Sequence, residues 1–395
     1  MQEKVMFIGA GDYQKKGIEK AKEMGLVVIA TDGNPDASGL KIADFAYVID
    51  VKNFEKNLEI ARKNAIDGIL TIATEVGVKT VSYICQELNL PGIKMEVADR
   101  CTDKELMRKL FRDANIPVPL SYPVFNLQEL TQKAEKIGFP VVIKPADSAG
   151  SRGVKKVDNN NELENAFFSA MSYSVKKKVL VEEFLEGVES SVEAFVTDKK
   201  INILELSDKI RTAPPYLLDT TVIFPSAYPL KIQHNIIDIA KKAINAVGIN
   251  IGAVHTEIMM TPSGPVPVEL AARGAGFKVY TDILPKVTGI DILKATIQCA
   301  LGDPVDLSRT KAVASVLKFV EVKPGKIKKI INLEIAKEIP GIYEIEIYKK
   351  AGEIIEPLQS GEDRIGHIIS FGDSRVDAIN SIKNAENILK IIMEE

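Results

Sequence analysis

The chain has 395 residues, of which 46% are hydrophobic and 27% are charged, as is typical of a globular protein with two or three domains. Its 51 basic residues nearly balance 54 acidic ones, which leaves a net charge of −3. This balance argues against nucleic acid or an anionic membrane as a partner. No apolar run approaches the roughly 18 residues that a membrane span needs.

The amino-terminal stretch and the cysteines indicate a cytoplasmic protein. MQEKVMFIGAG lacks the basic region and cleavage site of a secretory signal. Cys85, Cys101 and Cys299 lie far apart, and no CxxC pair is present. We therefore expect three buried, reduced thiols.

The first hundred residues alternate short apolar runs with helical patterns. Strands are predicted at 4–11, 26–32, 45–50 and 67–73, and helices at 13–25, 53–65 and 78–89. Strands that alternate with helices of this length form βαβ units around a parallel sheet.

The first strand-to-helix turn carries a partial dinucleotide fingerprint. Gly9 and Gly11 match it, but the position of the third glycine is Gln14. Asp32, at the end of the next strand, is better interpreted as a turn residue. We expect this turn to line a small-molecule crevice, and an NAD-dependent oxidoreductase remains the alternative for this segment.

A glycine-rich loop follows the strand that ends at Lys144. Glycines and serines let backbone N–H groups approach phosphate oxygens, and a lysine adds a positive charge. The GK[ST] signature of a P-loop is absent. The alternative is a flexible surface hairpin with a solvated lysine. The loop residues of interest are Ser148, Gly150, Ser151 and Gly153.

The stretch KVLVEEFLEGVES, residues 178–190, is a predicted strand followed by a turn. Phe184 and Leu185 can offer an apolar wall to an adenine, and Glu189 is available for ribose hydroxyls. The alternative is an amphipathic strand pair whose glutamates face water.

Residues 255–270, HTEIMMTPSGPVPVEL, read as two antiparallel strands joined by a turn. A hairpin centred near Ser263 pairs Glu257 with Glu269, with Cβ atoms about 4.5–5.5 Å apart. Two carboxylates this close need a positive charge, and they suit one or two Mg²⁺ ions. His255 shares the face of Glu257, and Arg273 follows. The alternative is a solvated hairpin with two unrelated acids.

The order and spacing of these segments resemble those of the ATP-grasp carboxylate–amine ligases, a superfamily that includes biotin carboxylase, carbamoyl-phosphate synthetase, the glycinamide ribonucleotide synthetases and the L-amino acid ligases. The matching segments are DKELMRKLFRDANIPVP, GFPVVIKPADSAGSRGV, VEEFLEG with Glu189, and the pair HTE…VEL…R. The likeness covers roughly residues 1–310 and is closest to the L-amino acid ligases.

The resemblance implies a multidomain α/β and α+β architecture. Residues 1–98 would form a Rossmann-like preATP-grasp domain with a parallel sheet. Residues 99–310 would form the two-lobed ATP-grasp domain, whose smaller lobe, about 115–186, bears the lid. Residues 311–395 would form a small mixed C-terminal α/β module. Homodimers are common in the family, so a homodimer is compatible with the resemblance.

The resemblance also implies roles for individual residues. Lys104 and Lys144 would contact the ATP phosphates, and the loop from Ser148 to Gly153 would close over them as a lid. The adenine would contact backbone groups and apolar side chains of the segment Glu182, Glu183, Phe184 and Leu185. Glu189 would bind the ribose.

The same resemblance makes Glu257 and Glu269 ligands of Mg²⁺, with Mn²⁺ as a substitute. Arg273 would stabilise the reacting carboxylate or acylphosphate. Many members carry an asparagine two residues after the second glutamate, and here that position is Ala271, so the coordination of a second metal is open.

The implied reaction is ATP-dependent joining of a small-molecule carboxylate to an amine through an acylphosphate. Phosphoribosylamine–glycine ligase and carbamoyl-phosphate synthase-like activities are the alternatives within the superfamily. A non-catalytic nucleotide-binding protein is a further alternative. The residues expected to face the substrate are Arg211, Tyr216, His255 and Arg273.

Overall fold

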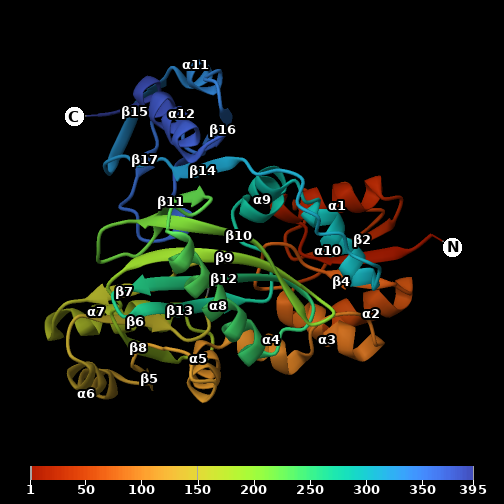
Figure 1. Cartoon of the computed structure of the whole chain (residues 1–395), viewed down its shortest axis with the longest axis horizontal. Helices are drawn as coiled ribbons and strands as arrows, with labels where there is room; N and C mark the ends of the chain where they lie inside the picture. Colours follow the sequence, from red (N-terminus) through yellow and green to blue (C-terminus); the bar gives the residue numbers. More distant parts are fainter. Residues whose placement is uncertain (1, 149, 395) are drawn as a thin grey trace.

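The computed structural model describes residues 2–148 and 150–394. It has an N-terminal parallel sheet, a small antiparallel lobe, and a long central sheet that continues into the C-terminal region (Figure 1). Residue 149, which belongs to the predicted lid, lies outside the described residues. Every helix in the described part of the chain is too short or too polar to cross a membrane.

The N-terminal domain is the parallel sheet that the sequence predicts, with strand order β3-β2-β1-β4. Strands β1, β2 and β4 are largely buried because helices cover the sheet, whereas the edge strand β3 is mostly exposed. Its elements are β1 (Lys4–Ile8), α1 (Asp12–Glu23), β2 (Val27–Asp32), β3 (Phe45–Val48), α2 (Phe54–Asn64), β4 (Gly68–Leu70) and α3 (Val78–Leu88).

Two helices lead into the small lobe, a four-stranded antiparallel sheet with order β5-β8-β6-β7. Asp103 caps α5 by accepting hydrogen bonds from the N–H groups of Glu105 and Leu106, which puts Lys104 in the first turn. The elements are α4 (Met95–Thr102), α5 (Lys104–Asp113), β5 (Ser121–Val124), α6 (Leu127–Ile137), β6 (Val141–Pro145), β7 (Lys155–Val157), η1 (Asn160–Glu162), α7 (Leu163–Tyr173) and β8 (Val179–Glu183).

The central sheet has the strand order β13-β12-β9-β10-β11-β14-β18-β16. Strand β11 pairs with β14, so the hydrogen-bonded ladder runs across the predicted boundary at residue 311. The strands and the helix between them are β9 (Val188–Thr197), β10 (Lys200–Arg211), β11 (Asp219–Phe224), α8 (Leu230–Val247), β12 (Gly252–Thr261), β13 (Gly264–Ala271), β14 (Ala314–Phe319), β16 (Ile342–Ile347) and β18 (Gly366–Gly372).

The remaining elements join these sheets. Helix α10 packs on the N-terminal sheet, where a Cβ atom at Gly68 would lie 2.7 Å from the carbonyl oxygen of Ala300. Helices α11 and α12 cover the C-terminal end of the central sheet (Figure 1). These elements are η2 (Val279–Ile283), α9 (Leu284–Thr288), α10 (Ile292–Leu301), β15 (Gly325–Ile331), α11 (Leu333–Lys337), β17 (Ile354–Ile355), η3 (Gly361–Asp363), α12 (Arg375–Ile388) and β19 (Lys390–Met393).

The predicted pairing of Glu257 with Glu269 is confirmed, although the hairpin reaches it by another route. The turn has two residues, because Thr261 pairs with Gly264. A bulge between the pair Ile258–Pro267 and the pair Glu257–Glu269 then adds one residue on β13. The tighter turn and the bulge cancel, so the two glutamates still face each other.

All three cysteines are buried and free, as expected. Burial raises the pKa of the Cys85 and Cys101 thiols to about 12 and that of Cys299 to about 11. At pH 8 the thiolate fraction of each is then about one in a thousand or less. We expect no rapid reaction of the folded protein with Ellman's reagent and three equivalents of reaction after unfolding in guanidinium. A fast-reacting thiol in the folded protein would contradict this burial.

Candidate functional site

The paired glutamates of the β12–β13 hairpin each meet a lysine from another element. Glu257 lies 2.5 Å from the Nζ atom of Lys209 on β10, and Glu269 lies 3.0 Å from the Nζ atom of Lys104 on α5. The repulsion between the two acids is therefore offset by side chains of the chain itself. Lys104 was predicted from the sequence, but Lys209 was not, because in ELSDKIR it has the pattern of an ordinary strand residue.

Lys209 is the centre of a buried carboxylate cluster. Its Nζ atom lies 2.9 Å from Glu189, 3.0 Å from Asp219 and 2.5 Å from Glu257. Burial alone would lower the pKa of Lys209, but the three carboxylates raise it well above its ordinary value. Carboxylate oxygens of Glu189, Asp219 and Glu257 lie within 4.8 Å of one another, a spacing that a single divalent ion can bridge.

A second buried network fixes Lys144. Its Nζ atom lies 2.5 Å from Glu182, and the guanidinium of Arg108 holds the same carboxylate with contacts of 2.9 and 3.2 Å. Burial and the charge of Arg108 lower the pKa of Lys144, and Glu182 opposes them. The side chain of Glu182 therefore anchors two cations and is not free for an adenine. Arg108 was not identified from the sequence, although it follows Lys104 by one helical turn.

Beside this network lies an apolar cleft of about 470 Å³, which we call the base cleft. Arg211 lines the base cleft and donates a hydrogen bond of 2.7 Å to the carboxylate of Glu189. The base cleft is lined by Arg108, Pro119, Val142, Lys144, Val154, Glu182, Glu183, Phe184, Leu185, Arg211, Leu217, Met259 and Val268.

The base cleft adjoins a polar one of about 530 Å³, the phosphate cleft, with which it shares Lys144, Val154 and Arg211. Lys104 donates to the carbonyl oxygen of Ser148 at 2.7 Å, which ties the start of the glycine loop to α5. Gly153 has a φ of +71°, and a Cβ atom there would lie 2.9 Å from the Tyr173 ring. The loop therefore needs glycine at this position.

The phosphate cleft opens into a third space of about 1090 Å³, the substrate cavity, and the two share Ser151, Asp219, Glu257 and Glu269. The lining of the cavity also includes Gly150, Glu193, Lys209, His255, Ala271, Arg273, Phe277, Phe319, Gly361 and Arg364.

Charged side chains line this cavity. His255 lies 2.6 Å from Glu193 and 3.5 Å from Glu257. Burial alone would lower the pKa of His255, but Glu193 and Glu257 raise it to about 9. Arg273 lies 3.6 Å from Glu75, which comes from the loop after β4 in the N-terminal domain. The cavity therefore combines Glu257 and Glu269, which it shares with the phosphate cleft, with cationic side chains that line the cavity but not the phosphate cleft.

Two residues considered in the sequence, Tyr216 and Asp32, lie outside the three clefts. Tyr216 lies in a separate cleft, between the glycine loop and the segment that includes η3. Asp32 accepts hydrogen bonds from the backbone N–H groups of Ala10 at 2.7 Å and Asn34 at 2.8 Å. Its carboxylate thus shapes the first strand-to-helix turn, as expected of a turn residue.

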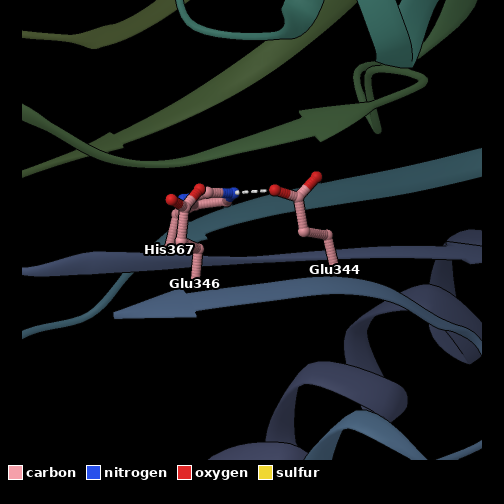
Figure 2. A group of neighbouring side chains, drawn as sticks. All are labelled: Glu344, Glu346 and His367. Carbon is pink, nitrogen blue, oxygen red and sulfur yellow. Dashed lines mark ion pairs between the residues drawn. The ribbon is translucent and has the colours of Figure 1, made fainter. Parts of the chain in front are cut away.

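A further cluster lies behind the cavity wall, where β16 and β18 bring Glu344, Glu346 and His367 together (Figure 2). His367 is fully buried, and its Nε2 atom lies 3.3 Å from Glu344. Lys278 contacts both glutamates. Lys278 already supplies the positive charge that these acids need, so we interpret the cluster as an ion-pair anchor between the C-terminal region and the segment after β13.

Two domain families match this chain. The ATP-grasp domain matches residues 137–282, and the L-amino acid ligase C-terminal domain 2 matches residues 318–394. The predicted relationship to ATP-grasp ligases is therefore confirmed. In sequence, the chain is 27% identical over 324 residues to the uncharacterized protein y4rH of Sinorhizobium fredii. That alignment covers 80% of this chain and 66% of y4rH, so the chain spans just under two thirds of that relative.

The fold is similar to those of several solved structures. An L-amino acid ligase from Bacillus licheniformis has a TM-score of 0.85 and 21% identity, with 100% of this chain and 99% of that one covered. A phosphoribosylglycinamide synthetase from Anaerococcus prevotii has a TM-score of 0.76 and 23% identity, with both chains fully covered. A biotin carboxylase from Campylobacter jejuni has a TM-score of 0.72 and 21% identity, with 99% and 92% covered. The predicted fold class is confirmed.

Proposed function

The chain carries an ATP-grasp domain and an L-amino acid ligase C-terminal domain, and on this premise we propose that it is an ADP-forming ligase that joins a small-molecule carboxylate to an amine with ATP and Mg²⁺. The observation that carries the proposal is the continuity of the three clefts. An apolar base cleft, a lysine-lined phosphate cleft and a charged substrate cavity follow one another and share residues at each junction.

The base and phosphate clefts suit a nucleoside triphosphate. Phe184 and Leu185 line the base cleft, and an adenine ring is flat and largely apolar. Lys104 and Lys144 line the phosphate cleft, where two cations can neutralise charge on the transferred phosphoryl group. Ser151 lies at the junction with the substrate cavity, so closure of the glycine loop there would exclude water from the reacting groups.

The acidic hairpin has the donor chemistry of a magnesium site. Carboxylate oxygens are the ligands that Mg²⁺ and Mn²⁺ prefer, and Glu257 and Glu269 both face the phosphate cleft. Ala271 offers no side-chain oxygen. Asp219 has a carboxylate oxygen within 4.8 Å of those of Glu257 and Glu189, but it is already paired with Lys209 at 3.0 Å, so we assign the metal to Glu257 and Glu269. A bound magnesium ion would neutralise charge on the phosphates.

The reaction would proceed in two displacements. A carboxylate oxygen of the first substrate attacks the γ-phosphorus, the bond to the β-phosphate oxygen breaks, and ADP leaves. The amine nitrogen then attacks the acyl carbon, the carbon–oxygen bond to phosphate breaks, and the nitrogen loses a proton to phosphate or solvent. Arg273 would stabilise the negative charge on the acylphosphate. No side-chain nucleophile is needed.

Hydroxylamine trapping tests this proposal. With ATP, Mg²⁺ and a panel of amino acids and other carboxylates, we expect ADP release that depends on one carboxylate, together with its hydroxamate. Omission of Mg²⁺ should abolish both products. The panel includes glycine with phosphoribosylamine and bicarbonate with an ammonia donor, which report the two alternative ligase activities. NADH binding without hydroxamate or ADP from any carboxylate would contradict the ligase and favour an oxidoreductase.

A further inference from the structure

An apolar pocket of about 650 Å³ lies between the N-terminal domain and the central sheet. We call it the interdomain pocket. Its walls come from β4 and α3, from β9 and β12, and from the stretch that runs from the end of β13 through η2 to α10. Buried side chains such as Leu70, Val78, Ile93 and Phe195 line it. A close-packed core leaves few spaces larger than a water molecule, and an apolar space of this size is typical of a ligand site.

Two buried polar atoms on the lining of this pocket have no hydrogen-bond partner among the described residues: the hydroxyl of Ser82, which is fully buried on α3, and the Nε atom of Arg273. The other hydroxyls of the lining are satisfied. Thr71 donates to a backbone carbonyl at 2.8 Å, and the hydroxyls of Tyr280 and Thr296 are 2.7 Å apart. Because an unpaired buried donor is costly, a ligand that accepts a hydrogen bond would be stabilised here.

Arg273 connects the interdomain pocket to the substrate cavity. Among the described residues it is the one side chain that lines both spaces, and none that lines the pocket also lines the base or phosphate cleft. One terminal nitrogen of Arg273 donates to the carbonyl oxygen of Gly274 at 2.9 Å, and another lies 3.6 Å from Glu75. A molecule that accepts from Nε would therefore act directly on the arginine that we assign to the acylphosphate.

The charges beside the pocket select an uncharged ligand. Arg273 would repel a cation, and the neighbouring Glu75 would repel an anion. Because these two side chains already pair with each other, neither is free to compensate an ion that loses its water in apolar surroundings. The pocket therefore suits a molecule with an apolar body and a neutral polar group.

We propose that the interdomain pocket is an effector site for an uncharged, largely apolar small molecule with a hydrogen-bond acceptor, such as an aromatic alcohol or amide. Its oxygen would accept from the Nε atom of Arg273, and the Ser82 hydroxyl is a second donor on the same lining. Occupancy would draw the guanidinium towards the pocket and slow the ligase. The effect on the ligase rests on the proposed function, whereas binding to the pocket does not.

Fluorine NMR of the whole chain without nucleotide tests the binding, with para-fluorobenzyl alcohol as the probe. The anionic para-fluorobenzoate and the cationic para-fluorobenzylamine should bind more weakly by about tenfold or more. Ser82→Ala should weaken binding of the alcohol by about two- to tenfold, the usual effect of one lost hydrogen bond. Val81→Phe should abolish it, because Val81 lines the pocket and the ring would fill the space.

Val175→Phe is the matched control, since it makes the same exchange at an exposed position of the small lobe. We expect it to bind the alcohol like the wild type. The proposal fails if the wild type does not bind the alcohol, or if Ser82→Ala and a folded Val81→Phe both bind it as the wild type does. It also fails if the charged probes bind as tightly as the alcohol.

Steady-state kinetics test whether binding acts through Arg273. With a carboxylate that yields hydroxamate, saturating para-fluorobenzyl alcohol should lower the wild-type kcat by about fivefold or more and have no effect on Val81→Phe. An unchanged rate would overturn the effector role. A rise only in the KM of the carboxylate would also overturn it, because the pocket would then belong to the substrate site. If no carboxylate yields hydroxamate, the ligase and the effector role fail together, while the NMR result still decides whether the pocket binds its ligand.

Discussion

Glu269→Gln is expected to lower the rate of ATP-dependent ligation by a factor of about 10² to 10³, the usual effect of losing one well-placed electrostatic contact. Glu269 lies opposite Glu257 on the hairpin and faces the phosphate cleft. Glutamine keeps the shape and can still accept a hydrogen bond from Lys104. The change therefore removes chiefly the charge that we assign to the metal.

Magnesium titration distinguishes a metal role from a role through Lys104. If Glu269 is a ligand, the variant should need more Mg²⁺ for half-maximal rate. Glu205→Gln is the matched control, because Glu205 is a buried acid on the same sheet that pairs with Arg309 at 2.6 Å, outside the three clefts. Unchanged ATP consumption in Glu269→Gln would remove the metal assignment. If the variant is slower but has the magnesium dependence of the wild type, Glu269 acts through its ion pair with Lys104 and is not a metal ligand.

The elements that carry the site were predictable because their signals are local. Each signal is made by residues that are neighbours in the sequence. These signals are the βαβ pattern of the first hundred residues, the glycine loop after Lys144 and the turn between two apolar runs. Even the pairing of Glu257 with Glu269 followed from symmetry about the turn. The bulge on β13 left no visible signal, and the prediction survived because the turn is one residue tighter.

The charge partners were not predictable, since they come from distant parts of the chain. Glu182 meets Arg108 across 74 positions, and Lys209 meets Glu257 across 48. The sequence shows a lysine on a strand and an arginine on a helix, which are usually solvated. Folding buries these two cations, and a buried cation needs a carboxylate partner to compensate for the water that it loses.

The role of the C-terminal residues was equally hidden. A predicted small module gives no reason to expect that β14 pairs with β11, because a ladder between strands about 90 residues apart leaves no local pattern. This pairing carries Phe319 into the substrate cavity, and the following strands bring Arg364 beside it. No function was therefore predicted for these residues from the sequence.

Glu182→Gln is expected to destabilise the folded protein by about 3–5 kcal/mol, because removing one partner of a buried ion pair leaves its cations uncompensated. Glu182 is 4% exposed, Lys144 is 6% and Arg108 is 1%. Burial alone would raise the pKa of Glu182, but Arg108 and Lys144 hold it well below its ordinary value. The stabilisation should therefore be complete above pH 5 and decline as pH falls below about 4.3, the ordinary glutamate pKa, towards the folded pKa.

Urea unfolding of Glu182→Gln, of Lys144→Met, of the variant that combines them and of a control variant measures this effect. Glu183→Gln is the control. The neighbouring Glu183 is exposed, and among the described residues its side chain accepts a single hydrogen bond, from the N–H group of Leu120, so we expect a loss of about 1 kcal/mol or less. Lys144→Met should destabilise the wild type, yet it should recover stability in the Glu182→Gln background, where it removes an unpaired buried cation. Such a reversal is what a coupled network gives in a double-mutant cycle. Simple additivity of Glu182→Gln and Lys144→Met would show instead that the two side chains are stabilised independently, and Lys144 would then need another account of how it is held in the phosphate cleft.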